Sequence, residues 1–339
     1  MRTRTARKWG AAILIAAVSL SGVLADGIAA NATGAIAPEK KSRTSVTHER
    51  AIITWDGTTE TIELALSVRS KGKSVGLVFP TPTPAKVTAG KLSSFEKVEK
   101  LIAPRATVVD DWWGTGVSGD LGADPKVLDR VKLGPIEATT IAASNSNGLS
   151  RWLKRNKFSI NERTDDALAG YINQKWSFVA VKLDATAGLT GSLDPVRFTF
   201  KTTKLVYPIR LNAALSTAQS MRLYVFDDHR VAVRRFDSAR RSPDAAQKVV
   251  WAGTVTEPGI GQFGRFLTVV DLEFDQPRKQ VRQDLQFTRD TADDAVTSSV
   301  VRYNPITLFG LPAGLLAVGW AGFGLILGLA WVFSRFRSR

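Results

Sequence analysis

The C-terminal part of the chain carries a long uncharged segment. Residues 311–333 read LPAGLLAVGWAGFGLILGLAWVF, and no charged side chain occurs between residues 303 and 334. Apolar residues over this length, at a rise of about 1.5 Å each, form a helix roughly 35 Å long, enough to cross a hydrocarbon core about 30 Å thick. A backbone in lipid must satisfy its own hydrogen bonds, so a transmembrane helix is predicted within residues 306–333.

Charge at the two ends of the chain predicts the orientation of this helix. The basic tail, residues 335–339, is expected in the cytoplasm, and the chain before the helix is expected outside. Four basic residues at the N-terminus precede an apolar stretch, residues 11–24, and small residues follow it. This pattern predicts a signal peptide over residues 1–25, with an uncleaved anchor as the alternative. We therefore expect a single-pass protein of the cell membrane, with an extracytoplasmic N-terminal domain and a cytoplasmic C-terminus.

Composition limits the partners of that domain. The formal net charge is +15, of which the N-terminal basic residues carry +4 and the tail +3, which leaves +8 for the ectodomain. A basic exported surface favours anionic neighbours, such as phospholipid headgroups or an anionic cell-wall polymer, and nucleic acid is not expected. The chain contains no cysteine, which excludes disulfides, thiolate catalysis and thiolate metal sites. No cofactor is expected.

The first half of the ectodomain mixes strands and helices. Residues 26–47 are small and polar and are expected to form a linker. Strands are predicted over 51–55, 58–68 and 74–79, and Asp56-Gly57 is expected to join the first two as a type I′ turn with positive φ at both positions. Helices are predicted from apolar spacing over 93–102, 149–156 and 164–172. Ser93 and Glu96 have capping-box spacing at the start of the first helix.

The second half is rich in strands. Residues 275–304 are polar and are expected to form a stalk, and Asp227-Asp228 is expected to turn a hairpin. Helices in the middle with strands on both sides predict an α+β fold with a mostly antiparallel sheet over residues 48–274, with a possible division near 185–195. Alternation and composition predict strands over 177–184, 196–201, 204–211, 221–226, 230–234, 249–255 and 266–274.

Several of these segments resemble a known family. The chain is similar to the uncharacterised bacterial proteins catalogued as domain of unknown function 2330, over roughly residues 49–228. The resemblance implies an exported domain, often with a terminal membrane helix, and no established activity. Many members carry cysteines after the signal, and this chain has none, so a lipid anchor or disulfide there is not implied. The segments that carry the resemblance are Glu49-Arg50-Ala51-Ile52-Ile53, Asp56-Gly57, Val78-Phe79-Pro80-Thr81-Pro82, Ala103-Pro104-Arg105, Trp152-Leu153, Tyr171 and Trp176-Ser177-Phe178.

Residues suited to catalysis are few. The chain has two histidines, and His229 follows Asp227-Asp228, so this cluster is the better candidate for a triad or a metal site. A solvated hairpin tip explains the same residues more simply, because turns favour Asp. An extracytoplasmic hydrolase that uses carboxylates or His229 stays open as the alternative function. The acidic loop with Asp110, Asp111, Asp120 and Asp124 lacks the spacing of a calcium loop.

Two sets of residues are candidates for ligand binding. Trp112 and Trp113 lie in a glycine-rich segment and are suited to stack on sugars, to sit among lipid headgroups, or to anchor the loop by burial. Arg151, Lys154 and Arg155 surround Trp152 and are candidates for an anion site, or for the wet face of a helix. From these features we predict a non-catalytic binding or scaffolding module that acts on envelope polymer or on another membrane protein.

Overall fold

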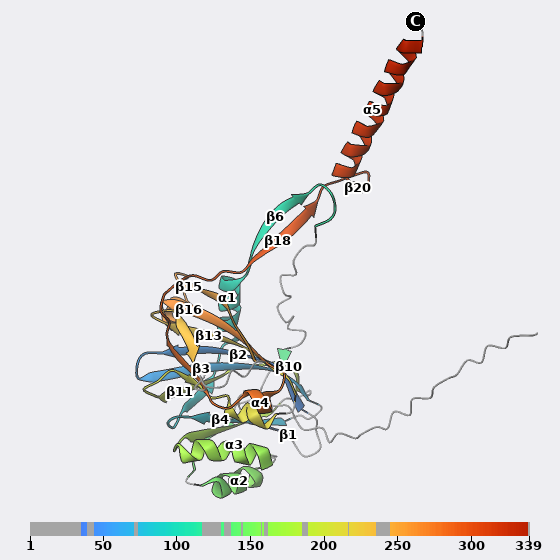
Figure 1. The fold of residues 1–339 in the computed structure, drawn as a ribbon. Coiled ribbons are helices and arrows are strands. Elements are labelled where there is room, and N and C mark those ends of the chain that lie inside the picture. Colours follow the sequence, from blue (N-terminus) through green and yellow to red (C-terminus); the bar gives the residue numbers. More distant parts are fainter. Residues whose placement is uncertain are drawn as a thin grey trace, which may run out of the picture.

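The computed structural model describes residues 35–38, 44–70, 74–116, 130–131, 137–143, 145–156, 158, 162–184, 189–215, 217–234 and 245–337. It shows a folded domain, a narrow stalk and one long helix that projects away from the domain (Figure 1).

The largest sheet forms the centre of the domain. Its pairing is antiparallel except between β13 and β2 and between β10 and β7. Two further strands, β11 (Val196–Lys201) and β5 (Lys86–Ala89), extend it beside β3. In spatial order the main strands are β15 (Ala245–Thr254), β16 (Phe266–Phe274), β13 (Gln219–Asp227), β2 (Thr44–Trp55), β3 (Thr59–Ser70), β10 (Leu189–Leu193) and β7 (Arg130–Val131).

A second, antiparallel sheet packs against the first. Side chains that point inward from both sheets form the main core, and the rings of Phe79 and Phe198 stack within it with centroids 4.4 Å apart. This arrangement buries one face of each sheet, as the alternation of apolar residues along the strands requires. In spatial order the strands are β1 (Ala35–Pro38), β4 (Ser74–Thr81), β9 (Ser177–Asp184) and β8 (Glu137–Ala142).

Helices cover the outer faces of both sheets. Helix α1 (Leu92–Ile102) lies on the large sheet and buries Phe95 and Val98 there. Helices α2 (Ser146–Arg155) and α3 (Glu162–Asn173) lie on the small sheet, where Leu153 and Tyr171 are fully buried. The domain therefore has four layers, helix, sheet, sheet and helices.

A small third sheet closes one side of the domain. It consists of β12 (Val206–Tyr207), β17 (Leu285–Arg289) and β14 (Val231–Arg234), beside the short helices η1 (Arg210–Ala214) and α4 (Pro277–Gln280). Residues 275–289 therefore belong to the folded domain, and the predicted stalk boundary at residue 275 is wrong. The buried carboxylate of Asp284 holds this segment, since it accepts hydrogen bonds from the Tyr171 hydroxyl and from the Ile209 and Arg210 amides.

The stalk is a two-stranded parallel ribbon made from distant parts of the chain. Strand β6 (Arg105–Asp111) follows α1, and β18 (Ser299–Pro305) precedes the C-terminal helix. A short hairpin of β19 (Thr307–Leu308) and β20 (Leu311–Pro312) then leads into α5 (Ala313–Arg337). The apolar helix thus begins at residue 313 and not at 306, because Phe309 and Gly310 have positive φ angles of 52° and 77° that turn the chain.

The α+β class with mostly antiparallel sheets is confirmed, and β9, β11 and β16 have the predicted bounds. Asp227-Asp228 does not turn a hairpin, because β13 and β14 belong to different sheets. Only Gly57 of the Asp56-Gly57 turn has positive φ, at 91°. The Asp56 carboxylate instead accepts hydrogen bonds from the backbone amides of Thr58 and Thr59.

Three further local predictions are wrong. Helix α1 begins at Leu92 after an N-cap residue without a side-chain cap, so Ser93 forms no capping box there. The predicted strand 204–211 is reduced to β12, because Pro208 has no amide hydrogen and the next two amides bind Asp284. The predicted linker also contains β1, which pairs with β4.

Candidate functional site

The start of α5 is joined to the stalk by backbone hydrogen bonds. The first amides of a helix have no partner inside the helix. Here the Ala313 amide donates to the Ile306 carbonyl at 2.9 Å, and the Gly314 amide donates to the Trp112 carbonyl at 2.8 Å. The Ile306 amide in turn donates to the Asp111 carbonyl at 3.0 Å. These bonds fix the helix to both strands of the ribbon.

Asp111 shapes the loop that reaches the helix. Its buried carboxylate accepts the backbone amides of Trp113 at 3.1 Å, Gly114 at 2.9 Å and Gly116 at 2.8 Å. The hydrogen bond from the Gly116 amide is the largest cause that lowers the pKa of Asp111 below its ordinary value. The carboxylate therefore stays charged and keeps its hydrogen bonds to the loop.

Large apolar side chains surround the start of α5 and face outward. Trp112 and Trp113 are 53% and 52% exposed, and Phe309, at the tip of the β19–β20 hairpin, is 92% exposed. We name Trp112, Trp113, Leu308, Phe309 and Leu311 the collar. The two indoles are therefore not buried loop anchors. Exposed aromatic side chains beside the end of an apolar helix are typical of the interface between lipid and water.

The collar packs closely on the first turns of α5. A β-carbon placed on Gly314 would lie 2.8 Å from Trp113 Cε3 and 2.9 Å from the Trp112 carbonyl oxygen, so only glycine fits beneath the loop. An open groove of about 610 Å³ lies between the loop and the helix, with Tyr303, Ala317 and Val318 among its walls. Its lining is largely apolar.

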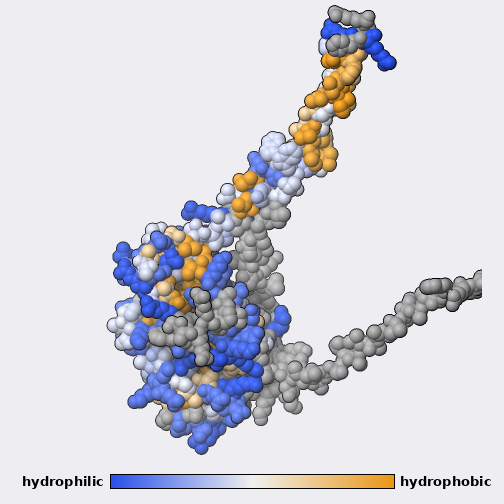
Figure 2. Space-filling view, viewed as in Figure 1, coloured by the Kyte–Doolittle hydropathy of each residue, from blue (hydrophilic) through white to orange (hydrophobic). Residues whose placement is uncertain are grey.

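Helix α5 has the length and composition of a membrane span. Residues Ala313–Arg335 are long and apolar enough to cross a bilayer, and none of their most apolar window is buried. The surface of α5 is largely hydrophobic, whereas the visible surface of the domain is mostly hydrophilic, with a smaller hydrophobic patch (Figure 2). At the far end, the Arg335 guanidinium lies 4.6 Å from the Trp331 ring centroid. The helix between Ala313 and Trp331 is about 27 Å long, close to the thickness of a hydrocarbon core.

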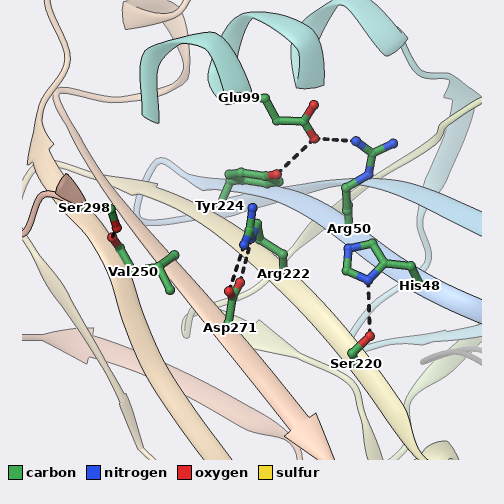
Figure 3. A network of polar contacts seen from close by, with 9 residues as sticks. All are labelled: His48, Arg50, Glu99, Ser220, Arg222, Tyr224, Val250, Asp271 and Ser298. Carbon is green, nitrogen blue, oxygen red and sulfur yellow. Dashed lines mark hydrogen bonds and ion pairs between the residues drawn. The ribbon is translucent and has the colours of Figure 1, made fainter. Parts of the chain in front are cut away.

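A polar network under α1 joins the domain to the stalk (Figure 3). Glu99 of α1 pairs with Arg50 of β2 and accepts a hydrogen bond from the Tyr224 hydroxyl of β13 at 3.2 Å. On the same face, Arg222 forms two hydrogen bonds to Asp271 at 2.7 and 2.8 Å. Because α1 continues into β6, the contacts of Glu99 fix the helix from which the stalk emerges, whereas the half-buried Arg222–Asp271 pair joins β13 to β16.

The base of the stalk is held on the other side by β15. The Ser298 hydroxyl donates to the Val250 carbonyl at 3.0 Å, and the Arg105 amide donates to the Ser298 carbonyl at 3.2 Å. His48 lies on the same sheet face, 3.2 Å from the Ser220 hydroxyl. Burial, and then the charge of Arg50, lower the pKa of His48 below its ordinary value, which favours the neutral ring at pH 7.

The structure separates the two predicted ligand sets. Trp112 and Trp113 belong to the collar, whereas Arg151, Lys154 and Arg155 are exposed on α2, at the opposite end of the molecule (Figure 1). The half-buried Trp152 between these basic residues packs against the ring of Phe158 at 6.2 Å. The two sets do not form one site.

The His229 cluster has the contacts of a structural turn. Asp227 accepts the amides of Asp228 and His229, and the His229 ring bonds to Asp293 at 2.8 Å. Among the described residues, no three His, Asp or Glu side chains are grouped so that they could hold a metal ion. Asp120 and Asp124 lie outside the described residues.

Sequence reasoning missed two features. It assigned Phe309 to the membrane helix, although the Phe-Gly pair before Pro312 is a turn signal that separates it from the helix. It also missed a polar cavity of about 330 Å³ beside the N-terminus of α1, lined by residues of three neighbouring strands and of η2 (Gly261–Phe263). These side chains are far apart in the sequence and lack a motif.

Comparison with known proteins gives a family but no activity. Among solved structures, the baculovirus P35 protein aligns with 73% of this chain and 98% of its own, at 11% identity and a TM-score of 0.37, and nothing about the present chain follows from it. No curated protein sequence matches the chain. The family model of an uncharacterized protein conserved in bacteria, DUF2330, matches residues 28–288, which is more than half of the chain. The chain therefore belongs to the DUF2330 family.

Proposed function

We propose that this protein is a single-pass membrane protein that holds a non-catalytic binding or scaffolding domain outside the bacterial cytoplasmic membrane. The observation that carries the proposal is the continuous hydrogen-bonded path from the ribbon into an exposed apolar helix, with the collar at the junction. In this arrangement α5 spans the bilayer, the collar lies among the lipid headgroups, and Arg335 and Arg337 lie in the cytoplasm.

The ribbon sets the distance between the domain and the lipid. Strands β6 and β18 have seven residues each, so at about 3.3 Å per residue the ribbon is roughly 23 Å long. Paired strands hold this distance better than a single extended chain, since each strand supports the other. A protein that only needed to remain attached would not require such a spacer, which supports a role in presenting the domain to a partner.

Extraction of membranes tests the anchor. The full chain is expected to stay in the pellet after washes with high salt and with alkaline carbonate. A chain that ends at residue 310 is expected to leave the membrane. Release of the full chain by the salt wash would contradict the proposal, because an apolar span of this length does not leave lipid under those conditions.

Cross-linking of cells that produce the full chain tests the binding role. Complexes with envelope polymer or with a membrane protein are expected on intact cells, and removal of wall polymer distinguishes between the two. A protein that remains uncross-linked before and after removal of the polymer would contradict a binding or scaffolding role.

A further inference from the structure

We propose that the outer face of the large sheet, beside the N-terminus of α1, binds an acidic glycan, that is, sugar residues that carry carboxylate or phosphate groups. The inference rests on the proposed extracytoplasmic binding role and gives it a site and a ligand class. We name the surface the threonine face and define it by Thr54, Thr59, Thr61, Thr199, Lys86 and Lys201, which belong to strands β2, β3, β11 and β5.

Strand register places these residues side by side. Thr54 pairs with Thr61, Thr61 with Thr199, and Thr199 with Lys86, so one row crosses four strands. Their chain neighbours Ile53, Ile62 and Phe198 are fully buried in the core, which directs the row to the opposite face of the sheet. The hydroxyls of Thr61 and Thr199 lie 3.2 Å apart. The result is a flat row of hydroxyl groups with an exposed lysine at its edge.

The polar cavity opens beside this row and contains a built charged group. Glu63 is 2% exposed, and Arg197 donates to its carboxylate at 2.7 and 3.2 Å. The other carboxylate oxygen accepts the backbone amide of Lys91, just before α1. Glu63 is therefore fixed from two sides at the floor of the cavity, whose other walls include Thr54, Thr61, Ser94, Gln262 and the ring of Phe263.

This lining suits a sugar ring. A sugar presents hydroxyl groups around its edge, which need both donors and acceptors, and an apolar face of C–H groups. The threonine hydroxyls and the Gln262 amide supply both kinds of polar partner, and the Phe263 ring offers an apolar wall. A volume of about 330 Å³ lies at the lower end of the range for small-ligand pockets.

The charge around the cavity favours an acidic ligand. Glu63 balances Arg197, and the Asp56 carboxylate at the hairpin tip is bonded by the amides and hydroxyl of its own turn. Lys86, Lys91 and Lys201 are exposed cations near the row. Lys201 Nζ donates to the Thr59 hydroxyl at 2.9 Å, and its charge also acts on the Asp56 carboxylate. Lys91 lines the cavity, and Lys86 and Lys201 lie along the adjoining row, so these cations attract sugars that bear negative charge.

Binding to the full-length protein in lipid nanodiscs tests the proposal. The probes are an oligogalacturonate for carboxylate, a phosphorylated mannan oligosaccharide for phosphate, a neutral maltooligosaccharide, and inorganic polyphosphate as a polyanion without sugar. Binding of either acidic glycan at least tenfold more tightly than both controls is expected, and which one binds identifies the acidic group. No binding of either acidic glycan, or equal binding of polyphosphate, would overturn the proposal.

Matched variants locate the site. Lys86→Gln with Lys201→Gln is expected to weaken binding about tenfold, and Thr61→Val, which keeps shape but removes one hydroxyl, about fivefold. The control is Arg163→Gln with Lys175→Gln, on and just after α3, which removes the same charge from an exposed region on the small sheet and is expected to leave binding unchanged. A loss confined to Lys154→Gln with Arg155→Gln on α2 would overturn the proposal in favour of that helix.

The test separates this inference from the proposed function. If the nanodisc-bound protein captures no acidic glycan but still cross-links to an envelope partner in cells, only the threonine face is wrong. If the protein leaves membranes on salt washing, the anchored role fails whatever the glycans do.

Discussion

Glu60 is a fully buried acid with an incomplete set of hydrogen bonds. One carboxylate oxygen accepts the Val206 amide at 3.2 Å, and the other, within the described part of the chain, has no partner. Burial raises the pKa of Glu60 well above its ordinary value of 4.5. The folded state therefore keeps a proton that the unfolded state releases, so the free energy of unfolding falls as pH rises above about 4.5.

Glu60→Gln is expected to remove much of this fall, because the amide stays neutral at every pH. Denaturant titrations between pH 5 and 8 measure the slope, which for one group is at most about 1.4 kcal/mol per pH unit. The slope that remains comes from Asp284, whose pKa burial also raises, and, with the opposite sign, from His48, whose pKa burial lowers. Glu96→Gln, on the exposed surface of α1, is the control and should keep the original slope. Equal slopes in both variants would contradict a protonated Glu60.

Gly314 is the residue at which the collar meets the helix. Gly314→Leu is expected to destabilise the packing of the collar on α5 by about 2 kcal/mol, because the new side chain overlaps Trp113 and the Trp112 carbonyl. Cleavage by chymotrypsin after Trp112 or Trp113 in nanodiscs should then rise about thirtyfold. Gly319→Leu is the matched control, since nothing lies within 4 Å of its added carbon. Unchanged cleavage in Gly314→Leu would show that the loop does not pack there.

At the scale of elements, Asp284 joins three segments that are distant in sequence. Its carboxylate binds Tyr171 of α3, the start of η1, and the Arg210 side chain at 2.8 Å. Asp284→Asn is expected to cost roughly 2–4 kcal/mol in the free energy of unfolding, because Arg210 loses its counter-charge in a mostly buried site. Asp290→Asn, which breaks a more exposed pair with Arg230, should cost less than about 1 kcal/mol. Equal costs would contradict the joining role of Asp284.

The ribbon is the element most open to disruption, because no other described strand pairs with it. Val301→Pro is expected to weaken it by about 1–3 kcal/mol, since proline cannot donate to the ladder. Backbone amides of β6, the partner strand, should exchange hydrogen faster than in the unsubstituted protein, while the variant stays in the membrane pellet. Val301→Thr keeps the β-branched shape and serves as the control. Unchanged exchange in Val301→Pro would contradict the paired stalk.

Local patterns predicted the elements better than their pairing. Alternation marked the bounds of β11, which has one buried face, and apolar composition marked those of β9 and β16, which are buried on both faces. The partnership of β6 with β18 joins residues nearly two hundred positions apart and leaves no local pattern. The polar composition of the segment after α4 is typical of a stalk. Nothing in it shows that Asp284 packs against the domain, because its contacts come from α3 and η1, which are distant in sequence.

At the scale of the whole molecule, the sequence predicted the anchor more fully than the site. An apolar run with basic residues after it predicts a span and its orientation through length and charge alone. The Trp112-Trp113 pair of the collar could be recognised in the sequence, but the exposure of these side chains could not, because it depends on where the ribbon ends. The threonine face could not be predicted from the sequence. Threonine is common in strands for conformational reasons, and only the strand register aligns these hydroxyls in one row.

Labelling of single cysteines tests the proposed orientation most directly, because the chain contains no cysteine of its own. Lys154→Cys places a thiol on exposed α2, and Arg337→Cys places one at the exposed end of α5. On intact wall-stripped cells, a membrane-impermeant maleimide is expected to label Lys154→Cys at once and Arg337→Cys only after permeabilisation. The reverse order, or equal labelling of both before permeabilisation, would contradict a domain held outside the cell by a spanning α5.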